Sequence, residues 1–249
     1  MERLLHYRPD KAVIKAILRI GVPNGIENTM FQFGRLMTSS LVSSLGTAAI
    51  AANAATLSLA GIQYSAGGAV QNSAVAVVGR CVGAEEKEQA KHYTRLLLGI
   101  AYVTVGIVAI LLCLFSNPLL RFYGLSGGTS EIARELLIYH SIASILLWPV
   151  AFCLPPAIRA AGDVKFTMVV SVFSMWVFRV ALAYVLSKES VSLFGLFSFS
   201  GMNLGVMGVW IAMSVDWLCR TVCFLARFIS GKWLTKYRKI PTKKAENEA

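Results

Sequence analysis

Long stretches without a charged residue are the feature that most restricts how this chain can fold. The 249-residue sequence has no Asp, Glu, Lys or Arg between Arg35 and Arg80, nor in the stretches 96–120, 136–158 and 190–215. Each stretch is long enough for the roughly 20 residues that a helix needs to cross a bilayer, and the first is long enough for two. Because a backbone in lipid must satisfy its own hydrogen bonds, these stretches predict transmembrane helices rather than lipid-exposed loops.

Composition supports the same class. Only 15% of the residues are charged and the mean hydropathy is +0.62, whereas a soluble domain usually has about a quarter of its residues charged. A net charge of +11 could indicate nucleic-acid binding, but the basic residues are distributed as membrane topology would place them. We therefore predict an all-α integral membrane protein whose partner is the lipid bilayer and not a nucleic acid.

The pattern predicts six transmembrane helices. Their approximate bounds are 17–45, 48–79, 93–115, 132–158, 164–186 and 204–228. A turn at 44–47, which contains Gly46, separates the first two. The chain then divides into an N-terminal segment 1–16, a transmembrane lobe 17–228 and a basic tail 229–249. The tail is polar with charges of both signs, which predicts disorder.

Basic residues predict the orientation of these helices. Lys and Arg gather before the first span, after the second, after the fourth and after the sixth, while the other three connections hold few of them. Cytoplasmic loops are the ones enriched in Lys and Arg. We therefore expect a multi-pass protein of the cell membrane with both termini in the cytoplasm.

Ionisable residues inside the spans are costly and mark candidate functional positions. They are Glu27, Arg35, His140, Arg179, Asp216 and Arg220. Asp216 and Arg220 are four residues apart and meet on one helix face, so an internal ion pair is favoured over an ion-coupling site. Arg179 has no partner nearby in sequence, and Asp216 is one candidate, which makes Arg179, Asp216 and Arg220 a candidate buried charge network. For His140 a polar packing role is favoured over proton relay.

A polar stripe follows the first span. On a helix, six residues fall within an arc of roughly 100° with Glu27 at its edge: Asn24, Asn28, Gln32, Arg35, Ser39 and Ser43. Pro23 loosens the start of this helix. Interrupted helices of this kind line binding sites in transporters, so a water-filled cavity is favoured over hydrogen bonding between helices.

The second span repeats the pattern more weakly with Asn53, Thr56, Gln63, Tyr64 and Gln71. Cavity lining and packing between helices are both open here. The resulting candidate substrate- or ion-binding residues are Glu27, Asn28, Gln32, Arg35, Gln63, Tyr64 and Gln71.

Enzyme motifs are missing from the sequence. It contains no HExxH, GxSxG or GxxxxGK, and its five cysteines include no CxxC pair. We predict no catalytic residue, no metal site and no cofactor.

Five short motifs in order resemble the multidrug and toxic compound extrusion (MATE) exporters, specifically their C-terminal six-helix lobe. The motifs are Ile20 to Pro23, Gly46 to Ala52, Val78 to Ala84, Ile158 to Asp163 and Trp210 to Trp217, and the resemblance covers residues 10–240. It implies export of amphipathic, often cationic, compounds in exchange for Na⁺ or H⁺, through a cavity between two lobes. Some members place a coupling Glu where this chain has Phe31, so an ion-coupling role for Glu27 is a hypothesis from its membrane position alone.

Such an exporter has about twelve spans, so the resemblance implies a second six-helix lobe. That lobe would be a missing N-terminal half, a separate chain or another copy, and a truncated or split gene product is favoured. Two alternatives stay open. One is a related flippase for lipid-linked oligosaccharides, since Arg35 and Arg179 would suit a pyrophosphate, and the other is a non-transporting membrane subunit.

Overall fold

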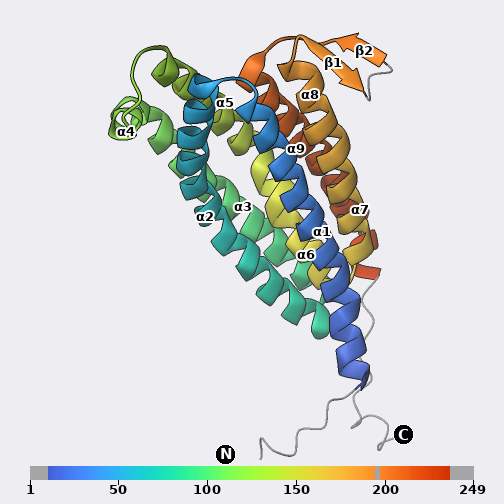
Figure 1. The fold of residues 1–249 in the computed structure, drawn as a ribbon. Helices are drawn as coiled ribbons and strands as arrows, with labels where there is room; N and C mark the ends of the chain where they lie inside the picture. The colour runs from blue at the N-terminus through green and yellow to red at the C-terminus, as the bar shows by residue number, and fades with distance from the viewer. Residues whose placement is uncertain (1–10, 194–196, 236–249) are drawn as a thin grey trace, which may run out of the picture.

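Six long helical rods lie along one another in the computed structural model, which describes residues 11–193 and 197–235 (Figure 1). The rods are α1 (Lys11–Ser43), α2 (Thr47–Gly83), α3 (Lys87–Leu114), Gly127–Ala160, Val164–Ser187 and α9 (Gly205–Ile229). The fourth rod consists of α5 (Gly127–Trp148), η2 (Pro149–Cys153) and α6 (Leu154–Ala160). The fifth rod consists of α7 (Val164–Ser174), η3 (Met175–Ala181) and α8 (Leu182–Ser187). The expected all-α membrane fold is confirmed, and the ends of the rods lie within six residues of the ends of the expected spans.

Four rods are long and apolar enough to cross a membrane: α3, Gly127–Ala160, Val164–Ser187 and α9. The other two, α1 and α2, are longer at 33 and 37 residues but do not reach the same apolarity, because polar side chains recur along them. The count of six membrane crossings therefore stays a prediction.

Outward apolar faces show where lipid would contact the bundle. Along α3, Val103, Ile107 and Leu114 are each more than half exposed. A contiguous apolar surface of this kind is rare on soluble monomers. The described chain begins at Lys11 and ends at Thr235 near the same end of the bundle (Figure 1), as an even number of crossings requires.

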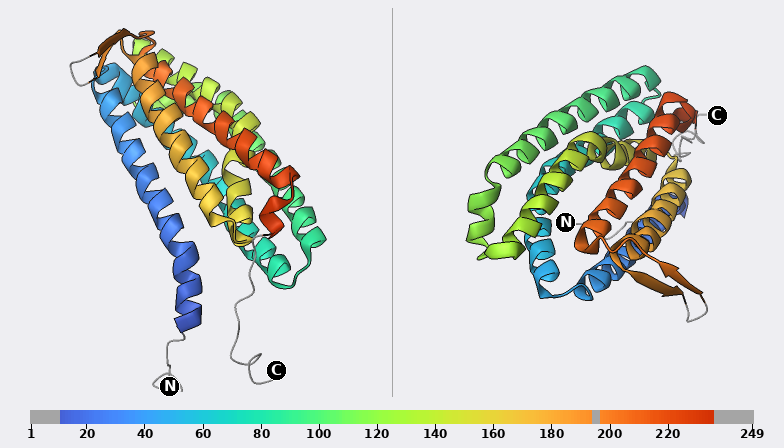
Figure 2. Two further views of the ribbon diagram at one scale, coloured as in Figure 1. Left: turned by 90° about the vertical axis from the view of Figure 1, so that its right-hand side faces the viewer. Right: turned by 90° about the horizontal axis from the view of Figure 1, so that it is seen from above.

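Helix–helix contacts divide the bundle into a closely packed part and a more open part. In the packed part, α2 lies against α3, α5 and α6, while α8 and α5 lie against α9. In the open part, α1 rests mainly on α7 and η3, and its first half stands away from the other helices (Figure 2). The turn expected between α1 and α2 is present, with Gly46 at φ +98°, a backbone conformation that suits glycine.

Three elements differ from the sequence-based expectation. Between the predicted spans 93–115 and 132–158, where no helix was predicted, a short helix α4 (Ser116–Phe122) forms, since a proline in the first helical turn is tolerated. An antiparallel hairpin of β1 (Ser190–Leu193) and β2 (Phe197–Ser200) precedes α9, with Ser190 opposite Ser200. Its alternation of serine with apolar residues has the two-residue period of a strand.

The third difference concerns the tail. Residues 229–249 were expected to be disordered, but η4 (Lys232–Thr235) is a helical turn. The Trp233 side chain is buried and stacks on Phe228 at 5.5 Å between ring centroids. The lobe therefore extends to Thr235, and the rest of the expected tail, like the N-terminal segment before Lys11, lies outside the described residues.

Candidate functional site

A hollow of about 490 Å³ lies where α1, α2, η3 and α9 meet. We call it the α1 pocket. Its lining residues are Gln32, Arg35, Leu36, Thr38, Ser39, Val42, Asn53, Leu57, Arg179, Val209, Trp210 and Met213. Three members of the predicted first-span stripe, Gln32, Arg35 and Ser39, thus reach one hollow. Asn24, Asn28 and Ser43 lie on the same helix outside it.

The charge in the α1 pocket is positive. Arg35 and Arg179 line it, and no carboxylate does among the described residues. The Arg35 side chain is exposed and makes no ion pair or side-chain hydrogen bond with a described residue. Arg179 approaches Asp216 at 3.7 Å between Nη1 and Oδ2, a distance too long for a hydrogen bond.

Asp216 is the centre of a buried charge network behind the pocket. Its Oδ1 accepts hydrogen bonds from Arg220 Nε at 2.8 Å and from the Ser174 hydroxyl. Arg220 also donates to the Ser171 carbonyl at 2.9 Å. Asp216 thus pairs with Arg220, as their spacing predicts, and Arg179 is the third member of the same cluster.

Phe31 covers this network from α1. The guanidinium carbons of Arg179 and Arg220 lie 5.5 and 5.6 Å from its ring centroid, within the range of cation–π attraction. At this position an aromatic face therefore helps to hold two cations inside the bundle. A π-helical turn, η3, carries Arg179, and such turns are frequent at functional sites.

Glu27 lies outside the α1 pocket and is paired. Arg159 Nη1 donates to both of its carboxylate oxygens, at 3.1 and 3.2 Å, and the two side chains are 13% and 23% exposed. This pair joins α1 to α6. Arg159 directly follows the predicted fourth span, among the basic residues expected on the cytoplasmic side, and nothing in the sequence pattern pairs it with Glu27. The signal that could have found this pair is that a carboxylate inside a membrane needs a partner.

Polar residues of α2 mostly bond to neighbouring helices. Gln63 is buried and donates from Nε2 to Ser144 Oγ at 2.5 Å, and Thr56 donates to the Ala133 carbonyl at 3.3 Å. Only Asn53 reaches the pocket, and its Oδ1 accepts a hydrogen bond from Trp210 Nε1 at 3.0 Å. Of the two interpretations left open, hydrogen bonding between helices describes α2 better.

Tyr64 and His140 belong to a buried aromatic cluster. Tyr64 stacks on Trp148 and meets the edge of His140, with centroids 5.8 and 5.6 Å apart. The rings of Trp210 and Trp217 also lie against His140, with centroids 5.1 and 5.4 Å away. Neither ring nitrogen of His140 has a hydrogen-bond partner among the described residues. Tyr64 and Gln71 do not line the α1 pocket. No group of three metal-ligating side chains gathers within the described part of the chain.

Comparisons with known proteins agree with this arrangement. A family model described as MatE matches residues 23–185. The Probable multidrug resistance protein NorM of Thermotoga maritima is 28% identical over 222 residues, which are 88% of this chain and 44% of that protein. The chain thus spans less than half the length of this relative.

Two solved structures share the fold. A mutant of the Vibrio cholerae MATE transporter VcmN matches with a TM-score of 0.76 and 17% identity, over 88% of this chain and 47% of that one. A MOP superfamily transporter from Pyrococcus furiosus matches with a TM-score of 0.73 and 20% identity, over 97% of this chain and 53% of that one. In each case the likeness covers about half of the larger molecule.

Proposed function

The chain belongs to the MatE family, and on that premise we propose that it is one six-helix lobe of a secondary active exporter of amphipathic compounds. The observation that carries the proposal is the family match over residues 23–185, on a lobe with a hollow where α1, α2, η3 and α9 meet. Two curated relatives are named as probable multidrug resistance proteins, which favours drug export over the flipping of lipid-linked sugars. The chain is a transporter component and not an enzyme.

A second lobe completes this proposal. The chain covers 44% and 42% of two curated relatives, so a complete transporter needs about as much protein again. The exposed first half of α1 and the α1 pocket are the surfaces that a second lobe would adjoin. We assign the missing part to an N-terminal half, a separate chain or another copy.

Ion coupling is proposed at Glu27. Its carboxylate is partly exposed and, among the described residues, held by Arg159, whereas Asp216 is fully buried and shared by two arginines. A proton or Na⁺ that binds Glu27 would compete with Arg159 for the carboxylate oxygens. Binding of the ion would then release α1 from α6, which connects ion binding to a helix movement.

The orientation of the lobe follows from its basic ends. We propose that both termini face the cytoplasm of the cell membrane, because Lys11, Lys15 and Arg19 lie at the end of the bundle to which α9 returns (Figure 1). A fluorescent-protein fusion at the C-terminus should therefore fluoresce inside cells. If this fusion is dark, and a C-terminal fusion to a reporter that works only in the periplasm is active, the orientation is the reverse.

Transport itself is tested with dyes. Cells that express the chain together with its second lobe should extrude amphipathic dyes, and cells that express the chain alone should not. A chain that extrudes dye alone would indicate a working assembly of copies. If the complete assembly moves no dye of either charge, the chain is a membrane subunit with another role.

The coupling proposal is tested by Glu27→Gln in the complete transporter. The amide cannot be discharged by a proton, so efflux driven by an ion gradient should fall at least tenfold and lose its ion dependence. Glu88→Gln is the matched control, because Glu88 is exposed and pairs with Lys91 at the surface. Transport by the Glu27→Gln variant with unchanged ion dependence would eliminate Glu27 as the coupling residue.

A further inference from the structure

We infer that the α1 pocket binds the anionic head of an amphipathic substrate, a carboxylate, sulfonate or phosphate held between Arg35 and Arg179. The inference rests on the proposed export function and names the class of compound that this lobe recognises. It departs from the cationic substrates expected from the resemblance, because the charges that line the hollow have the opposite sign.

Positive charge exceeds negative charge around the α1 pocket. Three guanidinium groups, those of Arg35, Arg179 and Arg220, stand against the single carboxylate of Asp216. Arg220 and Ser174 occupy Asp216 Oδ1, and Arg179 reaches Oδ2 only at 3.7 Å. The region therefore keeps a net charge of +2, and two of its three guanidinium groups, those of Arg35 and Arg179, line the hollow.

The position of Arg35 also indicates an anion. It lies on a long helix of a membrane protein, and a guanidinium without a partner is costly at membrane depth unless it faces water or an anion. Gln32, Ser39 and Asn53 line the same hollow, which makes it polar enough to hold water. An arginine in such a place can hold a carboxylate or phosphate with two parallel hydrogen bonds.

The rest of the pocket lining is largely apolar. Leu36, Leu57, Val209 and Met213 line the hollow together with the Trp210 ring, whose orientation is fixed by the hydrogen bond to Asn53. A ligand that suits both kinds of lining has an anionic head and a hydrophobic or aromatic body. The other membrane carboxylate of the described lobe, Glu27, is outside the pocket and bonded to Arg159, so this lobe presents no negative group to a cation there.

The test compares two fluorescent probes that share a body and differ in charge. Pyrenebutyrate is anionic and pyrenebutyl-trimethylammonium is cationic. The protein is purified with any second lobe that it carries into phosphatidylcholine nanodiscs, and binding is followed by energy transfer from tryptophan to pyrene. Pyrenebutyrate should bind at least tenfold more tightly than its cationic counterpart.

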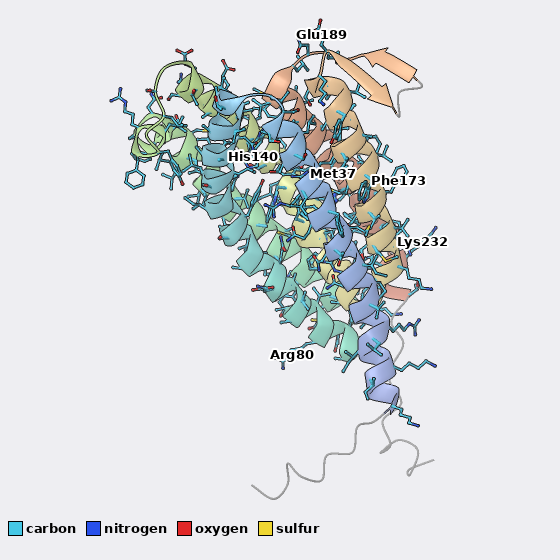
Figure 3. All side chains as sticks on the ribbon, viewed as in Figure 1. Met37, Arg80, His140, Phe173, Glu189 and Lys232 are labelled. Carbon is cyan, nitrogen blue, oxygen red and sulfur yellow. The ribbon has the colours of Figure 1, made fainter. Side chains whose placement is uncertain are left out.

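Variants assign that preference to the pocket. Arg35→Gln and Arg179→Gln should each weaken pyrenebutyrate binding about tenfold, the usual worth of one charge-assisted contact. Arg35→Lys should keep part of the affinity. Arg80→Gln removes the same charge at the far end of α2 (Figure 3) and should leave binding unchanged. Because Arg35 has no partner in the described chain, its replacement should not impair folding.

A second set of nanodiscs, which contains phosphatidylglycerol, tests whether the bound anion is a lipid headgroup or a soluble compound. If phosphatidylglycerol competes with pyrenebutyrate, a lipid headgroup is a natural occupant of the same site. If it does not compete while pyrenebutyrate binding still depends on Arg35, the site selects soluble anions over lipid headgroups. Equal or tighter binding of the cationic probe, or no effect of Arg35→Gln, would overturn the inference. Dye efflux that persists in that case would leave the proposed export function standing.

Discussion

Two polar stripes, on α1 and on α2, follow the same spacing in the sequence but have different surroundings in the fold. On α1, Gln32, Arg35 and Ser39 are exposed and face a hollow. On α2, Thr56 and Gln63 are buried and bonded to α5. A polar stripe therefore shows that a helix avoids lipid on that side, but only its neighbours decide whether it faces water or another helix.

The difference has a structural cause. A close fit surrounds α2, where a side chain at Gly67 would overlap the Trp148 ring, and polar groups in such contacts must bond across the interface. The first half of α1 has no comparable neighbour in the described lobe (Figure 2). The packed side therefore contributes stability, and the open side is free to bind a ligand.

The largest expected effect is at the charge network between the two sides. Asp216→Ala would leave Arg179 and Arg220 buried without their carboxylate, and breaking a buried pair costs about 3–5 kcal/mol. Thermal unfolding of the purified protein measures the loss. Glu88→Ala, at an exposed pair, should leave the melting temperature unchanged, and equal melting of both variants would show that the network is not structural.

An intermediate effect is expected on the packed side. Gln63→Ala removes the hydrogen bond to Ser144 and should lower the free energy of unfolding by about 1 kcal/mol, without a change in probe affinity. Both quantities are measured on the same preparation by thermal unfolding and by pyrenebutyrate titration. A loss of affinity with unchanged stability would mean that Gln63 takes part in ligand binding rather than in packing.

The smallest effect on stability is expected on the open side. Arg35→Gln should change the free energy of unfolding by less than about 0.5 kcal/mol, because Arg35 has no described partner. Chemical denaturation in nanodiscs is sensitive enough to detect a larger change. Substantial destabilisation would mean that Arg35 serves packing, and the two stripes would then be alike.

Local patterns predicted much of this molecule. Charge-free runs predicted the rods, glycine predicted the turn at Gly46, and the spacing of four predicted the pairing of Asp216 with Arg220. Such features depend on residues close together in the chain. The all-α membrane class follows from the same patterns.

Contacts between distant residues could not be predicted in this way. Glu27 and Arg159 are 132 positions apart, and their pairing depends on how α1 crosses α6. The π-helical turn Met175–Ala181, which includes Arg179, contains no proline that would have predicted an irregular helix there. The sign of the charge in the pocket was equally hidden, since it depends on which carboxylates are already paired.

The most direct test of the comparison is thiol labelling of one residue from each stripe. Ser39→Cys and Thr56→Cys are made in a background in which the five native cysteines are replaced, and each is treated in membranes with the impermeant anionic reagent methanethiosulfonate ethylsulfonate. Because Ser39 lines the α1 pocket and Thr56 is 0% exposed, the cysteine at 39 should react rapidly and the one at 56 only after denaturation. Equal rates at the two positions, or no reaction at 39 in the folded protein, would contradict the account.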